Sequence, residues 1–99
     1  MARFCAYRLR YDGALALDVQ AEILAGLDTR TMIPLLPPGD LSPTFPRLNP
    51  IVEIEGNRYV MATQFMAVVP TRDMGAFVAD FRSRSDEITA ALDFLFQGF

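Results

Sequence analysis

The sequence contains no histidine and no tryptophan, its nine positive residues are all arginine, and Cys5 is its only cysteine. Histidine, lysine and cysteine are the side chains most often used as a base or nucleophile near neutral pH. Their scarcity removes most routes to enzymatic catalysis. A single cysteine also excludes an intramolecular disulfide and a cysteine-based metal cluster. We therefore interpret Cys5 as a buried structural thiol.

Carboxylates remain as candidate catalytic groups. Three pairs lie close in sequence: Asp18 with Glu22, Glu53 with Glu55, and Asp86 with Glu87. Each pair falls on a face expected to be exposed or in the first turn of a helix, where a solvated charge is the ordinary interpretation. The sequence also lacks a glycine-rich phosphate loop, a zinc-ligand spacing and a nucleotide-binding fingerprint. We predict no catalytic residue, no metal site and no cofactor.

The charge pattern argues against nucleic acid and membrane as direct partners. The net charge is −3, and the arginines are scattered singly, without a basic run that could follow a phosphate backbone. No apolar stretch approaches the roughly 20 residues that span a bilayer, and no signal-type apolar block follows the N-terminus. We expect a cytoplasmic protein that does not bind DNA by itself.

Length and hydrophobic content indicate a single domain, residues 1–99, with an apolar surplus. Hydrophobic residues make up 52% of the chain, which is more than a core of this size needs. Surplus apolar residues in a small domain favour a covered surface patch, and a symmetric homodimer is the simplest cover.

Most of the chain has the pattern of β-strands. Residues 3–10 and 15–22 alternate with a period of two around a turn at residues 11–13, which predicts an antiparallel hairpin. In its second strand Leu17 faces inward, and Asp18 and Gln20 face outward. Ile23 and Leu24 follow, where a polar strand end would be expected, so they are either packed or part of a contact patch.

The middle of the chain predicts further sheet and one long loop. Residues 31–36 form a third strand whose Pro34 indicates an edge or a bulge, because proline cannot donate to a ladder. A proline-rich loop, residues 37–50, packs on the surface through Leu41, Phe45 and Leu48. Residues 51–55 and 58–69 form a second hairpin around Gly56 and Asn57. Residues 71–82 are expected to be irregular.

The C-terminal segment, residues 83–99, is the one long stretch with a helical period. Ser83 and Asp86 resemble a capping box, which places the helix start near Arg84. An apolar stripe follows, comprising Ile88, Leu92, Leu95, Phe96 and Phe99. Gly98 is a typical helix stop, and the large aromatic rings left at the chain end favour a partner contact.

Several segments together resemble the CcdB family of toxins: Leu-Asp-Val-Gln at 17–20, Met-Ile-Pro-Leu at 32–35, Pro-Ile-Val-Glu-Ile at 50–54, Val-Ala-Asp at 78–80, and Phe-Gln-Gly-Phe at 96–99. They occur in the family's order over nearly the whole chain. The resemblance implies a mainly β fold, an SH3-like barrel with a small additional sheet and one C-terminal α-helix. It also implies a homodimer and a CcdA-like antitoxin whose flexible part wraps the toxin.

The resemblance further implies a target. Members of the family bind the A subunit of DNA gyrase and trap the complex in which DNA is cleaved. Their contact surface corresponds here to Ile23, Leu24, Asp93, Phe96, Gln97, Gly98 and Phe99. Gln97 departs from the family's Trp-Gly-Ile tail and loses a flat aromatic surface of the kind that dominates interfaces. Two alternatives stay open: a relative with weakened or lost gyrase activity, and an endoribonuclease toxin of the MazF type.

Overall fold

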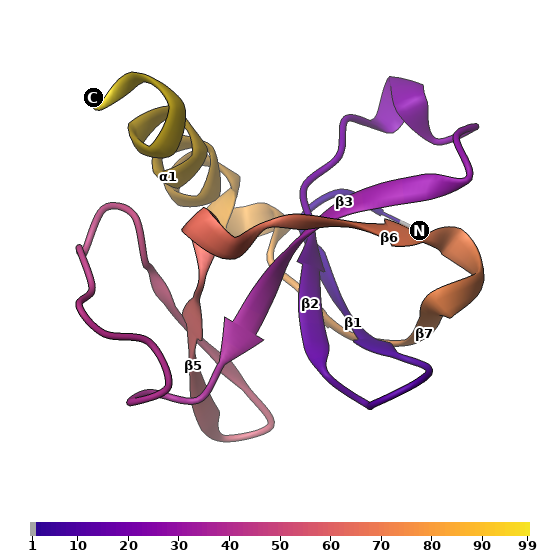
Figure 1. The fold of residues 1–99 in the computed structure, drawn as a ribbon, viewed down its shortest axis with the longest axis horizontal. Helices are drawn as coiled ribbons and strands as arrows, with labels where there is room; N and C mark the ends of the chain where they lie inside the picture. The colour runs from indigo at the N-terminus through magenta and orange to yellow at the C-terminus, as the bar shows by residue number, and fades with distance from the viewer. Residues whose placement is uncertain (1) are drawn as a thin grey trace.

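The computed structural model describes residues 2–99. Within them, seven strands form one curled antiparallel sheet, and one α-helix lies near the C-terminus (Figure 1). The strands are β1 Cys5–Leu9, β2 Leu15–Asp18, β3 Thr29–Leu36, β4 Ile51–Ile54, β5 Asn57–Met61, β6 Ala67–Pro70 and β7 Met74–Asp80. The helix α1 spans Ser85–Gln97, and short 3₁₀ turns occur at η1 Glu22–Leu24, η2 Thr63–Phe65, η3 Thr71–Asp73 and η4 Arg82–Arg84. The predicted fold class is confirmed.

The strand order is β4-β5-β3-β2-β1-β7, and β6 pairs with the first half of β3. The β4–β5 hairpin joins β3 at Leu35 and Leu36 and extends away from β1 and β2, as Figure 1 shows. β3 is therefore the strand that links β2, β1 and β7 to the β4–β5 hairpin.

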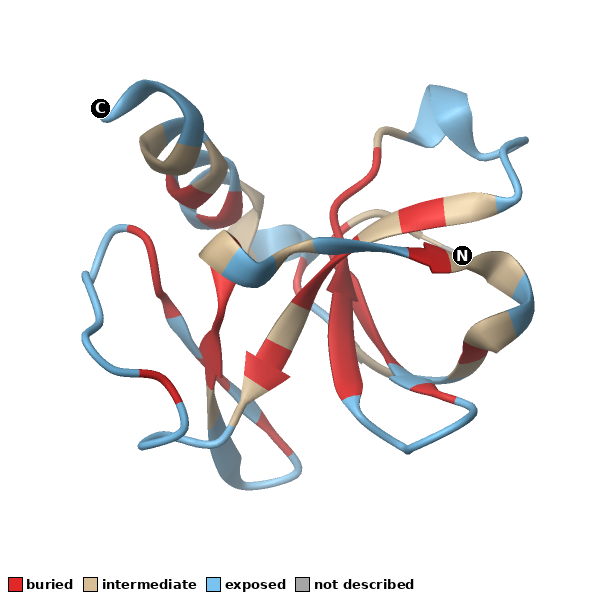
Figure 2. Cartoon of the chain, viewed as in Figure 1, coloured by how far each residue is buried: buried red, intermediate tan, exposed pale blue. Residues whose placement is uncertain are grey.

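Buried residues occur in all seven strands of the curled sheet (Figure 2), and their apolar side chains form two main clusters. One cluster contains Leu17, Ile33 and Met61 and is covered by Ile88 of α1. The second cluster comprises Cys5, Tyr7, Leu9, Ala16, Met32, Val69 and Met74. Cys5 is thus a buried thiol, as the sequence indicates. Because β1 to β3 contribute residues to both clusters, a buried polar residue in them must find its partners inside.

The prediction that Asp18 and Gln20 face solvent is wrong, since both side chains are buried. β6 and β7 contribute Val69 and Met74 to the second cluster and so cover the face that the alternation assigns to water. Asp18 forms an ion pair there with the buried Arg30. Glu22 leaves the strand and lies in η1.

Pro34 is not at a sheet edge, because β3 pairs with β2 on one side and with β6 and β5 on the other. The β6 ladder covers Thr29 to Met32, and the β5 ladder begins at Leu35. The Pro34 carbonyl accepts a bond from Ala62 N, on the side of β5 and β6. The Pro34 nitrogen, which carries no hydrogen, therefore faces the same side, in the gap between the β5 and β6 ladders. No ladder bond is lost there, so the absence of an N–H costs little.

Two other predictions need correction. The second hairpin turns at Glu55 and Gly56, which have φ angles of 53° and 81°, and its long second arm divides into β5, η2 and β6. Residues expected to be irregular contain β7, which pairs with β1. The pairing is tight at Gly75, where an added Cβ would clash with the Arg8 carbonyl oxygen.

The helix begins at Ser85 after a 3₁₀ turn, and no side chain caps its N-terminus, so the capping-box prediction is wrong. The helix ends as predicted, with Gly98 in the left-handed conformation at a φ of 79°. The apolar stripe is buried at Ile88, half-buried at Leu92 and Leu95, and exposed at Phe96 and Phe99. The sheet therefore holds the first half of the helix, and the second half projects from it (Figure 2).

The proline-rich loop, residues 37–50, packs on the barrel through Leu41 and Leu48, while Phe45 is exposed, contrary to the prediction. The buried Asn49 side chain holds this loop: its amide nitrogen donates to Met61 O at 2.8 Å, and its oxygen accepts from Phe45 N at 3.1 Å.

Candidate functional site

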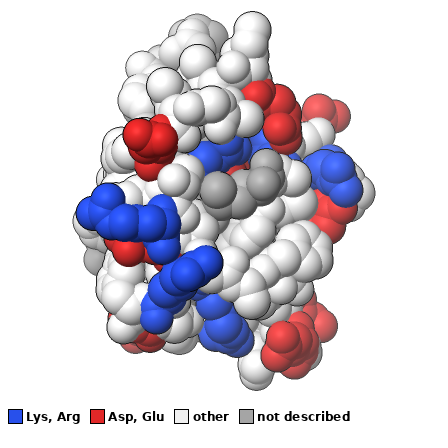
Figure 3. All heavy atoms as spheres, turned by 90° about the vertical axis from the view of Figure 1, so that its right-hand side faces the viewer, with Lys and Arg blue, Asp and Glu red and all other residues white. Residues whose placement is uncertain are grey.

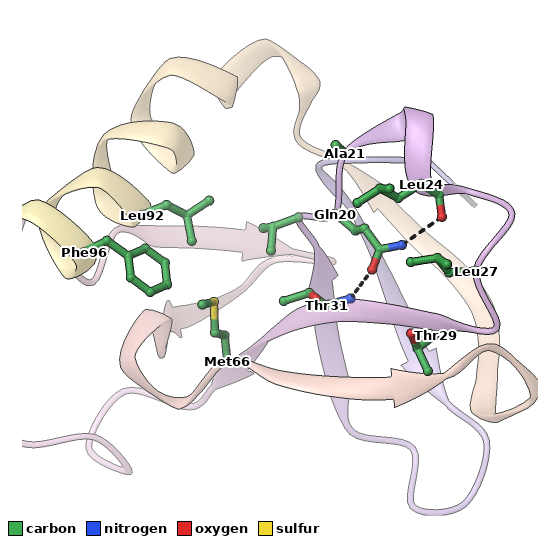
Figure 4. Close-up of a pocket in the computed structure, with 10 residues that line it drawn as sticks. Gln20, Ala21, Leu24, Leu27, Thr29, Thr31, Met66, Leu92 and Phe96 are labelled. Carbon is green, nitrogen blue, oxygen red and sulfur yellow. Dashed lines mark hydrogen bonds between the residues drawn. The ribbon is translucent and has the colours of Figure 1, made fainter.

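A groove of about 410 Å³ lies between η1 and the C-terminal half of α1 (Figure 4). Leu24 and Leu27 line it on the η1 side, and Leu92 and Phe96 line it on the helix side. Met66 and Thr31 lie between these walls in Figure 4. The full lining comprises Val19, Gln20, Ala21, Leu24, Leu27, Thr29, Thr31, Met66, Leu92 and Phe96. An open groove with this mostly apolar lining is suited to binding a side chain or peptide of a partner.

The fold brings together two predicted contact residues from opposite ends of the chain, Leu24 and Phe96, as lining of one groove. Ile23 lies next to the groove on η1 and is 92% exposed. The remaining predicted residues, Asp93, Gln97, Gly98 and Phe99, are exposed at the end of α1 outside the groove lining. The predicted residues thus occupy the two segments that border the groove.

Sequence reasoning missed Leu27 and Met66, which complete the groove. Leu27 follows Gly26 in a segment whose pattern ends in turn residues, and Met66 falls in a stretch that is apolar on both sides. Leu27 is 51% exposed, and no local sequence pattern predicts the exposure of a leucine at this position.

The C-terminal tail begins at a closed helix end. Gly98 N donates to Phe94 O at 3.0 Å, which closes the last helical turn, and Phe99 follows as an exposed residue. Phe94, which does not fit the apolar stripe, faces the proline-rich loop instead: the Arg47 guanidinium lies 4.9 Å from the centre of its ring. This contact joins the helix to the loop, whereas Phe96 and Phe99 are exposed.

Charged residues of both signs occupy the face of the molecule that is drawn in Figure 3. Figure 3 shows arginine side chains beside acidic side chains on this face, and a largely uncharged surface at the top of the view. Arg82 donates to Asp80 through Nη2 at 2.6 Å and holds the pKa of that carboxyl at about 2.

Burial raises the pKa of the Cys5 thiol and of the Tyr7 hydroxyl. Neither group is prepared to act as a base or nucleophile at neutral pH.

Within residues 2–99, no three acidic or cysteine side chains gather as a metal ion would require. In the same described part of the chain, α1 is too short and too polar to cross a membrane.

Two comparisons place the chain among known proteins. Residues 3–98 match the protein family described as CcdB protein. The fold resembles that of the Mycobacterium tuberculosis toxin MazF-mt6, with a TM-score of 0.76 over 93% of this chain and 95% of that one. The two sequences are 14% identical, so this likeness concerns the fold alone.

Proposed function

This chain belongs to the CcdB family, the toxins of toxin–antitoxin systems, and from that membership we propose that it poisons DNA gyrase. In this proposal the protein binds the gyrase A subunit and traps the complex in which DNA is cleaved. It makes and breaks no covalent bond itself. A CcdA-like antitoxin neutralises it.

The observation that carries the proposal is the position of Leu24 and Phe96 on opposite sides of one groove. The residues that the family uses against gyrase come from two segments far apart in sequence. A contact surface requires those segments to be neighbours, and here they are. Exposed aromatic and aliphatic side chains at its border, Ile23 and Phe99 among them, supply the apolar area on which interface energy depends.

Three arginine–carboxylate pairs of this chain are engaged with each other and do not offer a free base and cation for RNA cleavage of the MazF type. Such cleavage needs a base and a cation at the scissile phosphate. Among the described residues, Arg30 and Asp18 are both buried, where an RNA strand does not reach. Arg82 is paired with Asp80, and Arg84 with Glu87, so these carboxylates and cations already neutralise each other.

A homodimer is the second part of the proposal. Phe65 of η2 and Val68 of β6 are exposed, and Val68 pairs with Thr31, which lines the groove. β6 therefore presents an apolar outer side beside the groove, and a second copy of the chain would cover it. The surplus of hydrophobic residues, which make up 52% of the chain, leads to the same expectation.

The antitoxin is proposed to contact a wider surface than the tail. A disordered segment that folds on binding wraps its partner and distributes its contacts. Removal of residues 97–99 should therefore leave antitoxin binding in place. Loss of antitoxin binding in this truncation would contradict the wrapping mode.

The experiment that tests the function compares two exposed phenylalanines. Phe96→Ser removes an aromatic ring from the groove, whereas Phe77→Ser removes one that is 58% exposed on β7 and lies outside the groove. Gyrase-mediated DNA cleavage should fall for Phe96→Ser and persist for Phe77→Ser. If the parent protein halts growth without affecting gyrase, the target is a different one and the proposal fails.

A further inference from the structure

Gln20 lies where β2 separates from β3. The last ladder bond joins Val19 N to Thr31 O at 3.1 Å. In a regular antiparallel pair, Thr31 N would donate back to the Val19 carbonyl. Instead Thr31 N donates to Oε1 of Gln20 at 3.0 Å, and the Val19 carbonyl accepts from Nε of Arg3 at 3.1 Å. The Gln20 side chain therefore replaces a backbone acceptor at the point of divergence.

The other half of the same amide reaches η1. Nε2 of Gln20 donates to the Leu24 carbonyl at 3.1 Å, and both of these bonds are drawn in Figure 4. A glutamine can make this bridge because its planar amide carries an acceptor and a donor, as a peptide group does. One buried side chain thus connects the edge of β3 to the turn that carries Ile23 and Leu24.

Gln20 is itself held from the interior. Its backbone N–H donates to Oδ1 of Asp18 at 3.0 Å, and Oδ2 of Asp18 accepts from Nε of Arg30 at 2.8 Å. Asp18 and Arg30 are both buried. A continuous hydrogen-bonded connection therefore runs from the Arg30 guanidinium through Asp18 and Gln20 to the surface turn.

The turn needs such support because it contributes no side chain to the core. None of the three residues of η1 is buried, and a single 3₁₀ turn is not stable by itself. Its conformation must be fixed from outside if Ile23 and Leu24 are to be presented in one arrangement. Fixing a contact segment before binding lowers the entropy lost on association.

We propose that Gln20 is a positioning residue of the partner-binding surface, which fixes η1 against β3 so that Ile23 and Leu24 are presented beside the groove. This inference rests on the proposed function, because it takes η1 as part of the gyrase contact. The bridge through Gln20 is its subject, and Asp18 and Arg30 act by holding Gln20.

Two variants separate the bonds. Gln20→Met keeps the length of the side chain and removes both bonds. Gln20→Glu keeps an acceptor for Thr31 N but replaces the donor toward the Leu24 carbonyl with an oxygen. Asn49→Leu is the matched control, because it removes a buried side-chain amide with comparable bonds in the proline-rich loop.

The readouts are amide hydrogen exchange at Thr31, ¹⁵N relaxation at residues 22–27, and affinity for the gyrase A subunit corrected for the folded fraction. Gln20→Met should accelerate exchange at Thr31, raise the mobility of η1 and weaken binding about tenfold. Gln20→Glu should raise the mobility of η1 while Thr31 stays protected. Asn49→Leu should lower stability without changing η1 or the corrected affinity.

The inference would be overturned if ¹⁵N relaxation showed residues 22–27 to be as ordered in both Gln20 variants as in the parent protein. Equal loosening of η1 in Asn49→Leu would also overturn it, because the effect would then follow global stability. If the parent protein does not bind gyrase, the proposed function fails, and the mobility of η1 decides the positioning role without it.

Discussion

The Arg30 guanidinium and the Asp18 carboxylate form an ion pair in the interior, with an Nε to Oδ2 distance of 2.8 Å and side chains that are 1% and 0% exposed. Nη2 of Arg30 lies 2.8 Å from the same oxygen but is not aligned for a hydrogen bond. Nε therefore makes the directional bond, and the second nitrogen contributes its charge.

Removal of one member of this pair should be costly. Asp18→Ala leaves a buried guanidinium without its counter-ion, and we expect the free energy of unfolding to fall by about 3–5 kcal/mol. Arg58→Ala, at an exposed arginine of β5, is the control and should change it by less than about 0.5 kcal/mol. Urea unfolding measures both. A loss for Asp18→Ala as small as for Arg58→Ala would show that the pair does not stabilise the fold.

The sequence pattern of a short segment predicts those elements of the fold that depend only on residues adjacent in the sequence. The β1–β2 hairpin follows from period-two alternation, and the end of α1 follows from Gly98. The burial of Asp18 does not follow, because β6 and β7 cover its face and come from much later in the chain. β7 is missed for the same reason: its residues form a strand because β1 is available to pair with them.

The candidate site divides in the same way. Ile23 and Leu24 are recognisable as aliphatic residues where polarity is expected, and Phe96 and Phe99 as aromatic residues at a chain end. The groove between them depends on how α1 is placed against η1, which no local pattern contains. The role of Gln20 is equally hidden, since an alternating strand assigns its side chain to solvent.

Acid should weaken one surface contact in a defined pH range. Hydrogen bonds from Arg82 lower the pKa of the folded-state Asp80 carboxyl to about 2. Because this pKa is lower in the folded state than in the unfolded state, the ionised Asp80 stabilises the folded protein at pH values above the unfolded-state pKa. That stabilisation disappears as the pH falls towards about 2. Asp80→Asn should therefore be less stable than the parent at pH 5 and differ less from it near pH 2. Unfolding curves that keep the same separation at both pH values would contradict this assignment.

The apolar side of β6 predicts a dimer in solution. Sedimentation at micromolar concentration should show a species of twice the 11.0 kDa chain mass. Val68→Arg places a charge on the exposed side of β6 and should shift the population towards the monomer. A parent protein that sediments only at 11.0 kDa would exclude the dimer under these conditions.

Gln97 offers a gain-of-binding test. It is exposed at the last residue of α1, at the position where the family resemblance implies tryptophan. Gln97→Trp should strengthen binding to the gyrase A subunit by about 1–3 kcal/mol if an aromatic anchor is restored. The same substitution at an exposed helix position away from the tail, Thr89→Trp, is the control and should leave affinity unchanged. An increase of equal size in both variants would indicate nonspecific adhesion of the indole ring.

The most direct test of the account is gyrase-mediated DNA cleavage with the parent protein and with a truncation that lacks residues 97–99. These residues are exposed and lie beyond the buried part of α1, so the truncation should unfold at the same denaturant concentration as the parent. We predict that the parent traps the cleaved DNA complex and that the truncation, still folded, does not. A folded truncation that traps cleaved DNA as well as the parent would contradict the tail contact, and a parent that leaves gyrase unaffected would contradict the central claim.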